Sequence, residues 1–510
     1  MAPTTAAARS FTCLQCRLKL ARRSPRRLYH ASNYLRAEAP RPSVAPKFSI
    51  DIKHIRQNEA LYEQNCLERN YKTQADYPAR INCLFDEWNT CQQNARSHRE
   101  RNNQVKSQIA NPRAPQDEDS DWVQRLKGHT REELLKEAKY LKEKISYIEE
   151  KESALSVEVE SLAASIPNLT SAETPRGDDP IVVGYINAHP EPDPASSRRV
   201  WRSHVHIGQK LQLLDFASAS TTTGWGWYYL LNEAAQLEQA LVQYALSAAR
   251  KRKWGTVSPP SMVYSHIAAA CGFQPRDQNG EQQVYSIQQN SKDVGVKPEL
   301  SLSGTAEIPL AGMKANTTLD EAELPLKRVG VSRCYRAEAG ARGVDTKGLY
   351  RVHEFTKVEM FAWTLPSKEA SSAVFDEMLQ IQTEILTSLG LHCRILEMPS
   401  TDLGASATRK RDIEAFFPSR RAKDEGWGEV TSVSMCTDYQ TRRLATKVKV
   451  KSLGGKPAFL YTVNGTALAV PRVIAAVLEN GWNEEKGEVA IPECLWPWMD
   501  GVKVIKPKKI

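Results

Sequence analysis

The sequence predicts an α+β protein in which an antiparallel pair of long helices precedes a larger body of strands and helices. Two patterns carry this prediction. Apolar residues recur at helical seam spacings between residues 81 and 162, and strand-like runs with a period of two follow after residue 330. With 510 residues, the chain is long enough for two or three domains and a large apolar core.

Residues 1–32 form an arginine-rich segment that is typical of a mitochondrial presequence. Seven arginines and one lysine lie between residues 1 and 37, and the first carboxylate of the chain is Glu38. We expect cleavage between Arg27 and Ser32 and a mature protein in the mitochondrial matrix. The net charge is +9, and without these eight cations it would be close to neutral, so composition alone does not indicate a nucleic-acid partner.

The ten cysteines are scattered and give no disulfide framework. Cys13 and Cys16 form the only CxxC pair, inside the expected presequence, and no second pair is present to complete a zinc site. No apolar run approaches the roughly 18 residues that a membrane-spanning helix needs. We therefore expect no membrane partner.

The arm is predicted from residues that alternate at spacings of three and four, as in the seam of a coiled coil. The first helix has its seam at Ile81, Leu84, Trp88, Cys91, Ala95, His98, Asn102, Val105 and Ile109. The second helix repeats an aliphatic residue every seven positions, at Leu134, Leu141, Ile148, Leu155 and Leu162. Each helix has about 30 residues and is roughly 45 Å long.

Thr130 and Glu133 form an S/T-x-x-E capping box before the second helix. The segment between the helices is polar and contains the acidic cluster DEDSD. One narrow seam on each helix and a polar connection predict an antiparallel coiled-coil hairpin. A coiled coil that only joins two chains remains an alternative.

Prolines and small polar residues are enriched from residue 166 to 197, which predicts a connector. The expected organisation is a presequence at 1–32, a helical arm domain at 45–165, the connector at 166–197, the body at 198–503 and a basic tail at 504–510.

The body contains neither a GxxxxGK[ST] phosphate loop nor a GxGxxG fingerprint. Instead, the runs VSRCYRAEAG and GLYRVHEFTKVEMF predict a hairpin around a loop with Gly340, Gly343 and Gly348. The alternation of the second run places Arg351, His353, Phe355, Lys357 and Glu359 on one face. A guanidinium suits a phosphate, an aromatic ring suits a purine and a carboxylate suits an ammonium. We therefore expect a nucleotide triphosphate and an amine to lie across this face, with a solvated outer face as the alternative.

The segment YRAEAGARGVDTKGLYRVHEFTKVEMF resembles motif 2 of class II aminoacyl-tRNA synthetases, and in particular of seryl-tRNA synthetases. Further matches to that family are WGTVSPPSMV for motif 1, SGTAEIPL for the serine-binding segment, EVTSVSMCTDYQTRR for the metal and ATP segment, and VNGTALAVPRVIAAVLEN for motif 3. IRQN at 55–58 and the helical arm resemble the family's tRNA-binding domain. HIGQ at 206–209 is similar to a class I signature but has no KMSKS partner. The resemblance implies a class II catalytic domain on an antiparallel β-sheet flanked by helices.

The resemblance also implies ATP-dependent attachment of L-serine to tRNA(Ser) through a seryl-adenylate, with Mg2+ as cofactor. It implies ATP binding by Arg336, Glu338, Arg351, Val352, Phe355, Glu429, Ser432 and Arg472. Of these, Arg336, Glu429 and Arg472 would act in catalysis, and Glu429 and Ser432 would hold the metal. Serine would be bound by Thr305, Glu307, Glu359 and Thr466.

We expect two macromolecular partners, tRNA and a second copy of the chain. Exposed cations of the arm would meet tRNA phosphates, namely Arg96, Arg99, Arg101, Lys136, Lys139 and Lys142. A homodimer would form on the motif 1 helix around Leu237 and the strand leading to Pro260. Thr305 is also explained as a turn residue. A class II synthetase for another amino acid and a non-catalytic, synthetase-like RNA-binding protein remain alternatives.

Overall fold

The computed structural model describes residues 45–508 apart from 112–127, 192–198, 274–282, 339–347, 423 and 452–453. The expected presequence and the acidic tip of the arm therefore lie outside the described residues, as do Gly340 and Gly343. Among the residues that are described, no helix combines the length and the apolar character needed to cross a membrane.

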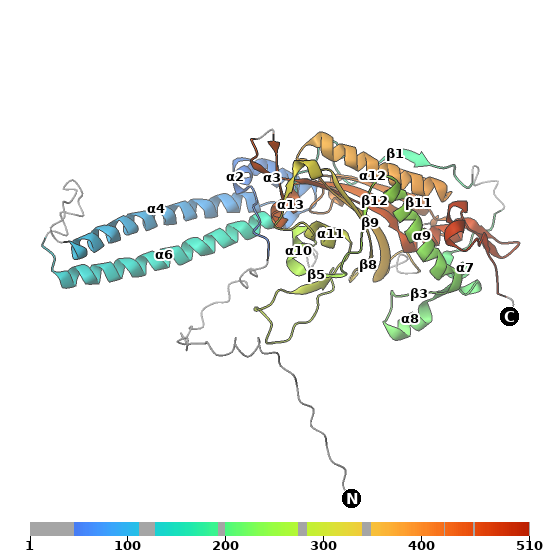
Figure 1. Ribbon diagram of the computed structural model, residues 1–510, viewed down its shortest axis with the longest axis horizontal. Coiled ribbons are helices and arrows are strands. Elements are labelled where there is room, and N and C mark those ends of the chain that lie inside the picture. Colours follow the sequence, from blue (N-terminus) through green and yellow to red (C-terminus); the bar gives the residue numbers. More distant parts are fainter. Residues whose placement is uncertain are drawn as a thin grey trace, which may run out of the picture. The chain divides into compact units, whose positions relative to one another are not determined.

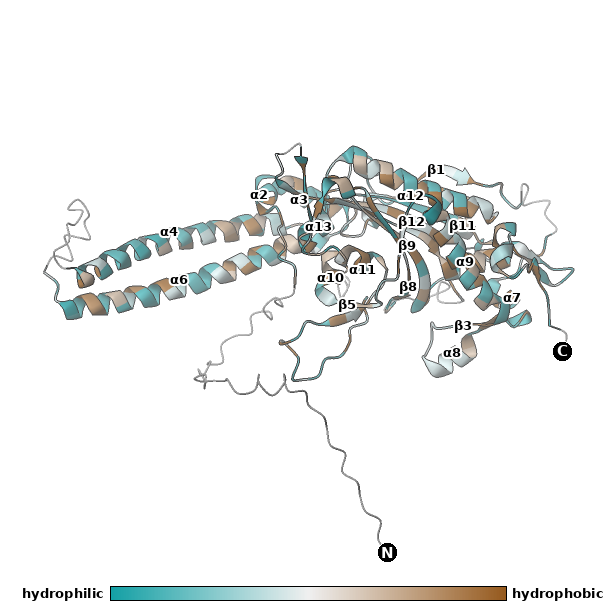
Figure 2. Ribbon diagram, viewed as in Figure 1, coloured by the Kyte–Doolittle hydropathy of each residue, from teal (hydrophilic) through white to brown (hydrophobic). Residues whose placement is uncertain are grey.

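The arm runs through short helices into a long helix pair. Its elements are α2 (Ile52–Gln57), α3 (Glu59–Glu68), η1 (Lys72–Gln74), α4 (Tyr77–Ala110) and α6 (Arg131–Ser165). The helices α4 and α6 lie side by side along their length (Figure 1). Every predicted seam residue of the two helices is buried or half-buried. Figure 2 shows mainly hydrophilic residues on these helices, interrupted by short apolar stretches.

Ion pairs between α4 and α6 fix their relative direction. Arg80, near the start of α4, pairs with Glu158 near the end of α6, whereas Arg101 pairs with Glu137 near the start of α6. The helices are therefore antiparallel, as predicted. The predicted capping box is also present, because Thr130 and the N3 residue of α6 exchange side-chain and backbone hydrogen bonds.

The body is built on one large sheet. In spatial order its strands are β1 (Ile181–Ile186), β10 (Cys393–Glu397), β11 (Arg409–Phe416), β12 (Trp427–Thr437), β15 (Tyr461–Ala469), β9 (Glu354–Thr364), β8 (Leu326–Tyr335) and β4 (Gly255–Val257). Neighbouring strands are antiparallel except for the edge pair β4 and β8, which is parallel. The predicted antiparallel sheet is confirmed with that one exception. Strand β1 lies inside the expected connector, where the surrounding prolines gave no sign of a strand.

Helices cover both faces of this sheet. The helices of the body are α7 (His204–Lys210), α8 (Phe216–Thr222), α9 (Asn232–Lys251), α10 (Ser265–Ala270), α11 (Glu307–Gly312), α12 (Lys368–Ser388), α13 (Tyr439–Leu444) and α14 (Val470–Gly481). The even-numbered residues Val358, Met360 and Ala362 of β9 join the main core with α9, α12 and α14. Phe361 and Trp363, on the opposite face, join a second core with α10, α11 and α13. The polar part of the odd-numbered face is therefore confined to the start of β9.

Smaller sheets complete the body. They pair β2 (Leu214–Asp215) with β3 (Tyr229–Leu230), β5 (Met262–Tyr264) with β6 (Leu300–Leu302), β13 (Lys447–Lys449) with β7 (Thr318–Asp320) and β14 (Pro457–Phe459), and β17 (Glu488–Ala490) with β16 (Trp482–Asn483) and β18 (Val504–Ile505).

The hairpin of β8 and β9 is shorter than the sequence predicts. Strand β8 ends at Tyr335 and β9 begins at Glu354, so Arg351 precedes the strand. The ring of His353 does not share the face of Phe355 in a regular strand but stacks on Trp227, with the ring centroids 5.9 Å apart. The prediction that the strand extends back to Arg351 is therefore wrong, because β9 begins only at Glu354.

Candidate active site

Strand β12 carries two of the predicted side chains on one face because its register shifts. Glu429 lies opposite Glu414 of β11, whereas Ser432 lies opposite Asp412. Residues three apart on a regular strand face opposite sides, but here Val430 is an extra residue on β12. The bulge brings Glu429 and Ser432 to the same face as Asp412.

The polar row continues across β15 and β9. Thr466 of β15 lies opposite Glu359 of β9, and its hydroxyl donates to the Glu359 carboxylate at 3.3 Å. Val433 pairs with Gly465, and the side-chain amide of Gln382 donates to the carbonyls of both Ser432 and Thr466, so these two residues lie close together. The polar face predicted for β9 is therefore continuous with that of β12.

These strands border a cavity that brings the predicted ATP-binding residues together. It is lined by Arg336, Glu338, Arg351, Val352, Phe355, Glu429, Ser432 and Arg472, and also by Thr466. Residues without a predicted role also line it, including Tyr350 and Lys357. Side chains from segments far apart in the sequence thus meet at one place.

Arg472 lies in the first turn of α14 and is held by three hydrogen bonds. Its guanidinium donates to the Glu429 carboxylate at 3.2 Å, to the Glu429 carbonyl at 2.9 Å and to the Tyr350 carbonyl at 2.9 Å. The guanidinium of Arg336 lies 5.2 Å from the centroid of the Phe355 ring. A cation and an aromatic face are therefore adjacent, an arrangement that suits a planar base and its phosphates.

Opposing charges keep Glu429 ionised. Burial alone would raise the pKa of the Glu429 carboxyl, but Lys410, Arg472 and Arg336 together lower it to about 2. Lys410 in turn lies 2.7 Å from the carboxylate of Asp412. Burial alone would lower the pKa of the Lys410 ammonium, but the carboxylates of Asp412 and Glu429 raise it. Charged groups therefore concentrate at this end of the cavity.

A second group of charges is deeply buried beside the cavity. Glu307 and Glu359 are 6% and 2% exposed, and the ammonium of Lys357 lies 2.7 Å from Glu359. The amide of Gln440 donates to Glu307 at 2.6 Å. Burial and the nearby charge of Glu359 raise the pKa of Glu307 to about 7, against the effect of Lys357. Two carboxylates and one ammonium therefore form a buried charged cluster beside the cavity, and its excess negative charge suits a small ligand with its own ammonium.

Thr305 lies close to this charged cluster, two residues before Glu307 and the start of α11. Its hydroxyl accepts a hydrogen bond from the backbone of Glu307 at 3.3 Å, and its carbonyl accepts one from Ser303 at 2.6 Å. These bonds show the turn role that the sequence allowed. Its role in binding serine stays a prediction.

Sequence reasoning missed several residues of the site. Lys357 lies on the predicted face of β9 but received no role, and Tyr350 lies beside the motif 2 loop. Lys410 and Asp412 lie two residues apart on β11 and so share a face. In the sequence they belong to a run of charges that is typical of a protein surface. Gln440 lies within the segment that resembles the metal and ATP segment, where its polarity gave no separate signal.

The predicted cations of the arm differ in their surroundings. Arg96 pairs with Glu100 at 3.0 Å, and Arg99 pairs with Glu149 at 2.8 Å. The side chain of Arg101 is 23% exposed and pairs with Glu137. The three predicted lysines of α6 are exposed, namely Lys136, Lys139 and Lys142. Each of the three arginines therefore already pairs with a carboxylate, although the side chain of Arg96 is still 82% exposed.

Two family models match the chain. Residues 50–170 match the seryl-tRNA synthetase N-terminal domain, and residues 288–481 match the tRNA synthetase class II core domain (G, H, P, S and T). The first match spans most of the arm, and the second contains the cavity.

Relatives match over most of the chain. The mitochondrial serine–tRNA ligase of Saccharomyces cerevisiae is 45% identical over 369 residues, which are 72% of this chain and 78% of the relative. That of Schizosaccharomyces pombe is 37% identical over 90% of each chain. A crystal structure of seryl-tRNA synthetase from Pyrococcus horikoshii complexed with ATP has a TM-score of 0.76 and 31% identity, covering 90% of this chain and 100% of that one. With this identity over most of its length, the chain belongs to the seryl-tRNA synthetase family of class II aminoacyl-tRNA synthetases.

Proposed function

We propose that this protein joins L-serine to ATP as seryl-adenylate and then transfers the seryl group to tRNA(Ser). The observation that carries the proposal is the cavity in which Arg336, Phe355, Glu429 and Arg472 meet, beside the buried carboxylates of Glu307 and Glu359. A nucleotide and an amine would thereby lie next to each other.

In the first step, Phe355 stacks on adenine, Arg336 holds the α-phosphate and Arg472 holds the γ-phosphate. The serine carboxylate attacks the α-phosphorus, the bond to the bridging oxygen breaks, and pyrophosphate leaves. This step needs no general base, because the attacking carboxylate is already ionised. Positioning and charge stabilisation supply the acceleration.

The cavity fits the magnesium ion that this reaction requires. Glu429 is held ionised and shares its face with the Ser432 hydroxyl, so two oxygen donors are available. The buried carboxylate of Asp412, opposite Ser432, also has one oxygen that finds no hydrogen-bond partner in the part of the chain that the structure describes. Magnesium favours one or two carboxylates together with substrate phosphates, and when bound it neutralises phosphate charge. We therefore propose Glu429 and Ser432 as its ligands.

Serine binds through its two polar ends. The carboxylates of Glu307 and Glu359 neutralise its ammonium, and the polar groups of Thr305 and Thr466 pair with its hydroxyl. Alanine would leave buried polar groups unpaired, so the pocket rejects it strongly. Threonine is excluded by its extra methyl group.

We expect serine use to depend on the ionisation of Glu307. The pKa of this carboxyl is raised to about 7, so it is neutral below that pH and ionised above it. Only the ionised form pairs with an ammonium, so kcat/KM for serine should fall by up to about tenfold per unit as the pH drops below 7. Exchange measured from pH 5.5 to 9 checks this. Glu307→Gln should flatten the acidic limb, whereas a flat wild-type profile would contradict the role of Glu307.

The arm holds tRNA for the second step, in which a terminal ribose hydroxyl takes the seryl group from the adenylate. Lys136, Lys139 and Lys142 on α6 contact phosphates, so they read shape more than base sequence. Residues 45–165 therefore serve as the tRNA-binding domain, and residues 198–503 as the catalytic domain.

We place the enzyme in the mitochondrial matrix. Two relatives are mitochondrial ligases, and residues 1–32 have the composition of a presequence. N-terminal sequencing of the mature protein should find a start between residues 28 and 33. A mature chain that retains Met1 would contradict the presequence.

We also propose a homodimer built on α9 and the chain from β4 to β5. Met262 and Tyr264 of β5 are 45% and 42% exposed, so apolar side chains are available there for a second copy. Light scattering at micromolar concentration should give twice the mass of one chain. A fully active monomer would contradict the dimer.

An ATP–pyrophosphate exchange panel tests the proposed function. Serine should support exchange, whereas threonine, proline and alanine should not. Exchange with another amino acid would favour a different class II synthetase, and no exchange by a folded protein would favour a non-catalytic RNA-binding role.

A further inference from the structure

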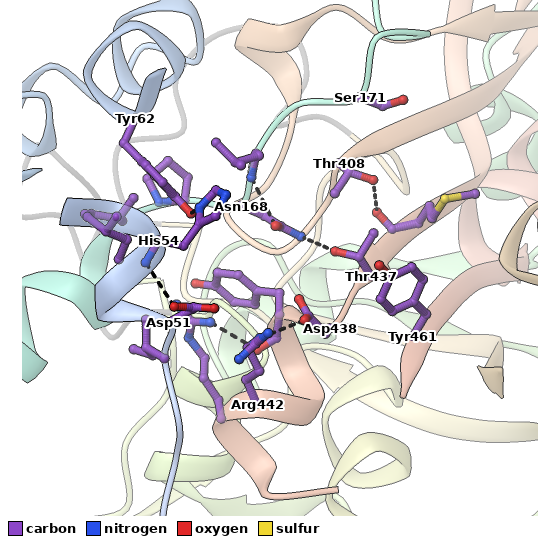
Figure 3. A pocket seen from close by; sticks show the side chains of 18 of the residues that line it. Asp51, His54, Tyr62, Asn168, Ser171, Thr408, Thr437, Asp438, Arg442 and Tyr461 are labelled. Carbon is purple, nitrogen blue, oxygen red and sulfur yellow. Dashed lines mark hydrogen bonds and ion pairs between the residues drawn. The ribbon is translucent and has the colours of Figure 1, made fainter. Parts of the chain in front are cut away.

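A cavity of about 640 Å³ lies at the root of the arm. Its walls come from α2 and α3, from the connector around Asn168, and from the chain where β12 ends and α13 begins (Figure 3). Among the described residues, none of those predicted to bind ATP or serine lines it. The polar contacts of its wall nevertheless lead towards the serine pocket.

Asn168 joins the arm to the end of β12 at this wall. Its carbonyl accepts hydrogen bonds from the side chains of Asn65, at 3.1 Å, and Arg69. Its side-chain amide donates to the carbonyl of Cys436 at 2.9 Å. It also donates to the hydroxyl of Thr437 at 3.0 Å, as Figure 3 shows. One residue of the connector therefore bonds to two domains.

The buried side chain of Arg69 holds the connector at Asn168 in a fixed position against the body. Its side chain is 1% exposed, and within the described chain its guanidinium donates to the carbonyls of Asn168, Leu403 and Gly404. Burial lowers the pKa of Arg69. No carboxylate of the described segments pairs with Arg69, and a buried guanidinium without such a partner is costly to desolvate. An apolar residue of similar size would serve packing better. The directed bonds to carbonyls hold the connector against the body.

Thr437 is the residue at which the chain leaves β12 for α13. Its φ is +46°, which is rare and strained for a β-branched residue. Such a conformation persists only where surrounding contacts hold it. The Asn168 amide supplies two of these contacts, at Cys436 and at Thr437 itself.

Gln440 follows three residues later and reaches the serine pocket. Its side chain is fully buried, donates to Glu307 at 2.6 Å and accepts from the hydroxyl of Thr462 at 2.7 Å. The chain that leaves Thr437, which the Asn168 amide holds, therefore leads to a direct hydrogen-bond partner of Glu307.

We infer that Asn168 is a positioning residue for the serine pocket, because it fixes the turn that places Gln440 against Glu307. The inference rests on the proposed function, since it takes Glu307 as a serine ligand. Loss of the Asn168 amide frees the turn and shifts the Glu307 carboxylate away from the serine ammonium. The same change leaves the ATP cavity intact, because Asn168 does not line it.

Kinetics of Asn168→Ala test the inference. The KM for serine in ATP–pyrophosphate exchange should rise roughly tenfold, as for loss of about one well-placed hydrogen bond, and the KM for ATP should stay within about twofold. Thr437→Val removes only the hydroxyl acceptor and keeps the side-chain shape. It should raise the serine KM about threefold, and it remains informative if Asn168→Ala does not fold.

Asn187 offers a matched control. Its amide also donates to backbone carbonyls, those of Leu386, Thr387 and Leu391, but it does not contact this junction. Asn187→Ala should leave the serine KM unchanged. If Asn168 acts through Gln440, the double variant Asn168→Ala/Gln440→Ala should raise the serine KM no more than the larger single change.

The wild-type enzyme tests the proposed function, and the Asn168 and Gln440 variants test the positioning role. Wild-type enzyme without serine-dependent exchange would overturn the proposed function itself. If the wild type is active, three results would overturn the positioning role of Asn168. They are an equal rise of the serine and ATP KM values in Asn168→Ala, a lower Tm of that variant without a change in its serine KM, and additive effects of Asn168→Ala and Gln440→Ala.

Discussion

Replacing Arg472 by alanine should lower kcat for serine-dependent ATP–pyrophosphate exchange by about 100- to 1000-fold at saturating serine. The guanidinium contacts Glu429 and the Tyr350 carbonyl, and we propose that it meets the γ-phosphate. Its removal takes a charge from the transition state and a partner from Glu429. Because serine binds elsewhere, its KM should change little.

Two further variants make this result specific. Arg472→Lys keeps the charge but loses the planar fork, so its rate should fall between those of wild type and Arg472→Ala. Arg394→Ala removes an arginine of similar exposure that pairs with Glu414 at 2.7 Å and does not line the cavity. Its exchange rate should stay near that of wild type. Near-normal exchange by Arg472→Ala would refute the phosphate role.

Shortening the arm should separate the two half-reactions. Gln92 of α4 hydrogen-bonds Glu152 of α6, so a short turn can join these positions in place of residues 93–151. This cut keeps Ile81 and Val159, which belong to the apolar cluster at the arm root. Exchange should remain near normal, whereas charging of tRNA should fall roughly a hundredfold or more because several phosphate contacts are lost together.

Point substitutions on the intact arm provide the control. The triple change Lys136→Ala, Lys139→Ala and Lys142→Ala should raise the KM for tRNA and make it less sensitive to salt. Arg99→Ala should have a smaller effect, because Glu149 already pairs with that guanidinium at 2.8 Å. If the shortened enzyme charged tRNA with an unchanged KM, the arm would be only a structural or oligomerising element.

Local periodicity explains which parts of the molecule could be predicted. The seam from Ile81 to Ile109 and the capping box at Thr130 depend on neighbours three or four residues away, so both are visible in the sequence. The alternation of β9 likewise places Glu359 on one face of the sheet and its chain neighbours Val358 and Met360 on the other. The family resemblance added the residues of β12, β15 and α14.

Long-range contacts explain what could not be predicted. The bulge at Val430, which turns Glu429 and Ser432 to one face, depends on pairing with β11. Asn168 and Gln440 read as ordinary polar residues of a connector and a helix. Their importance arises only when the fold brings segments more than 100 residues apart into hydrogen-bond contact.

Charging of total mitochondrial tRNA with labelled serine, read by isoacceptor, tests the central claim most directly. The enzyme should label tRNA(Ser) alone, and only in the presence of ATP and Mg2+. Label on the tRNA for another amino acid, or no label from a folded wild-type enzyme supplied with all substrates, would contradict the account.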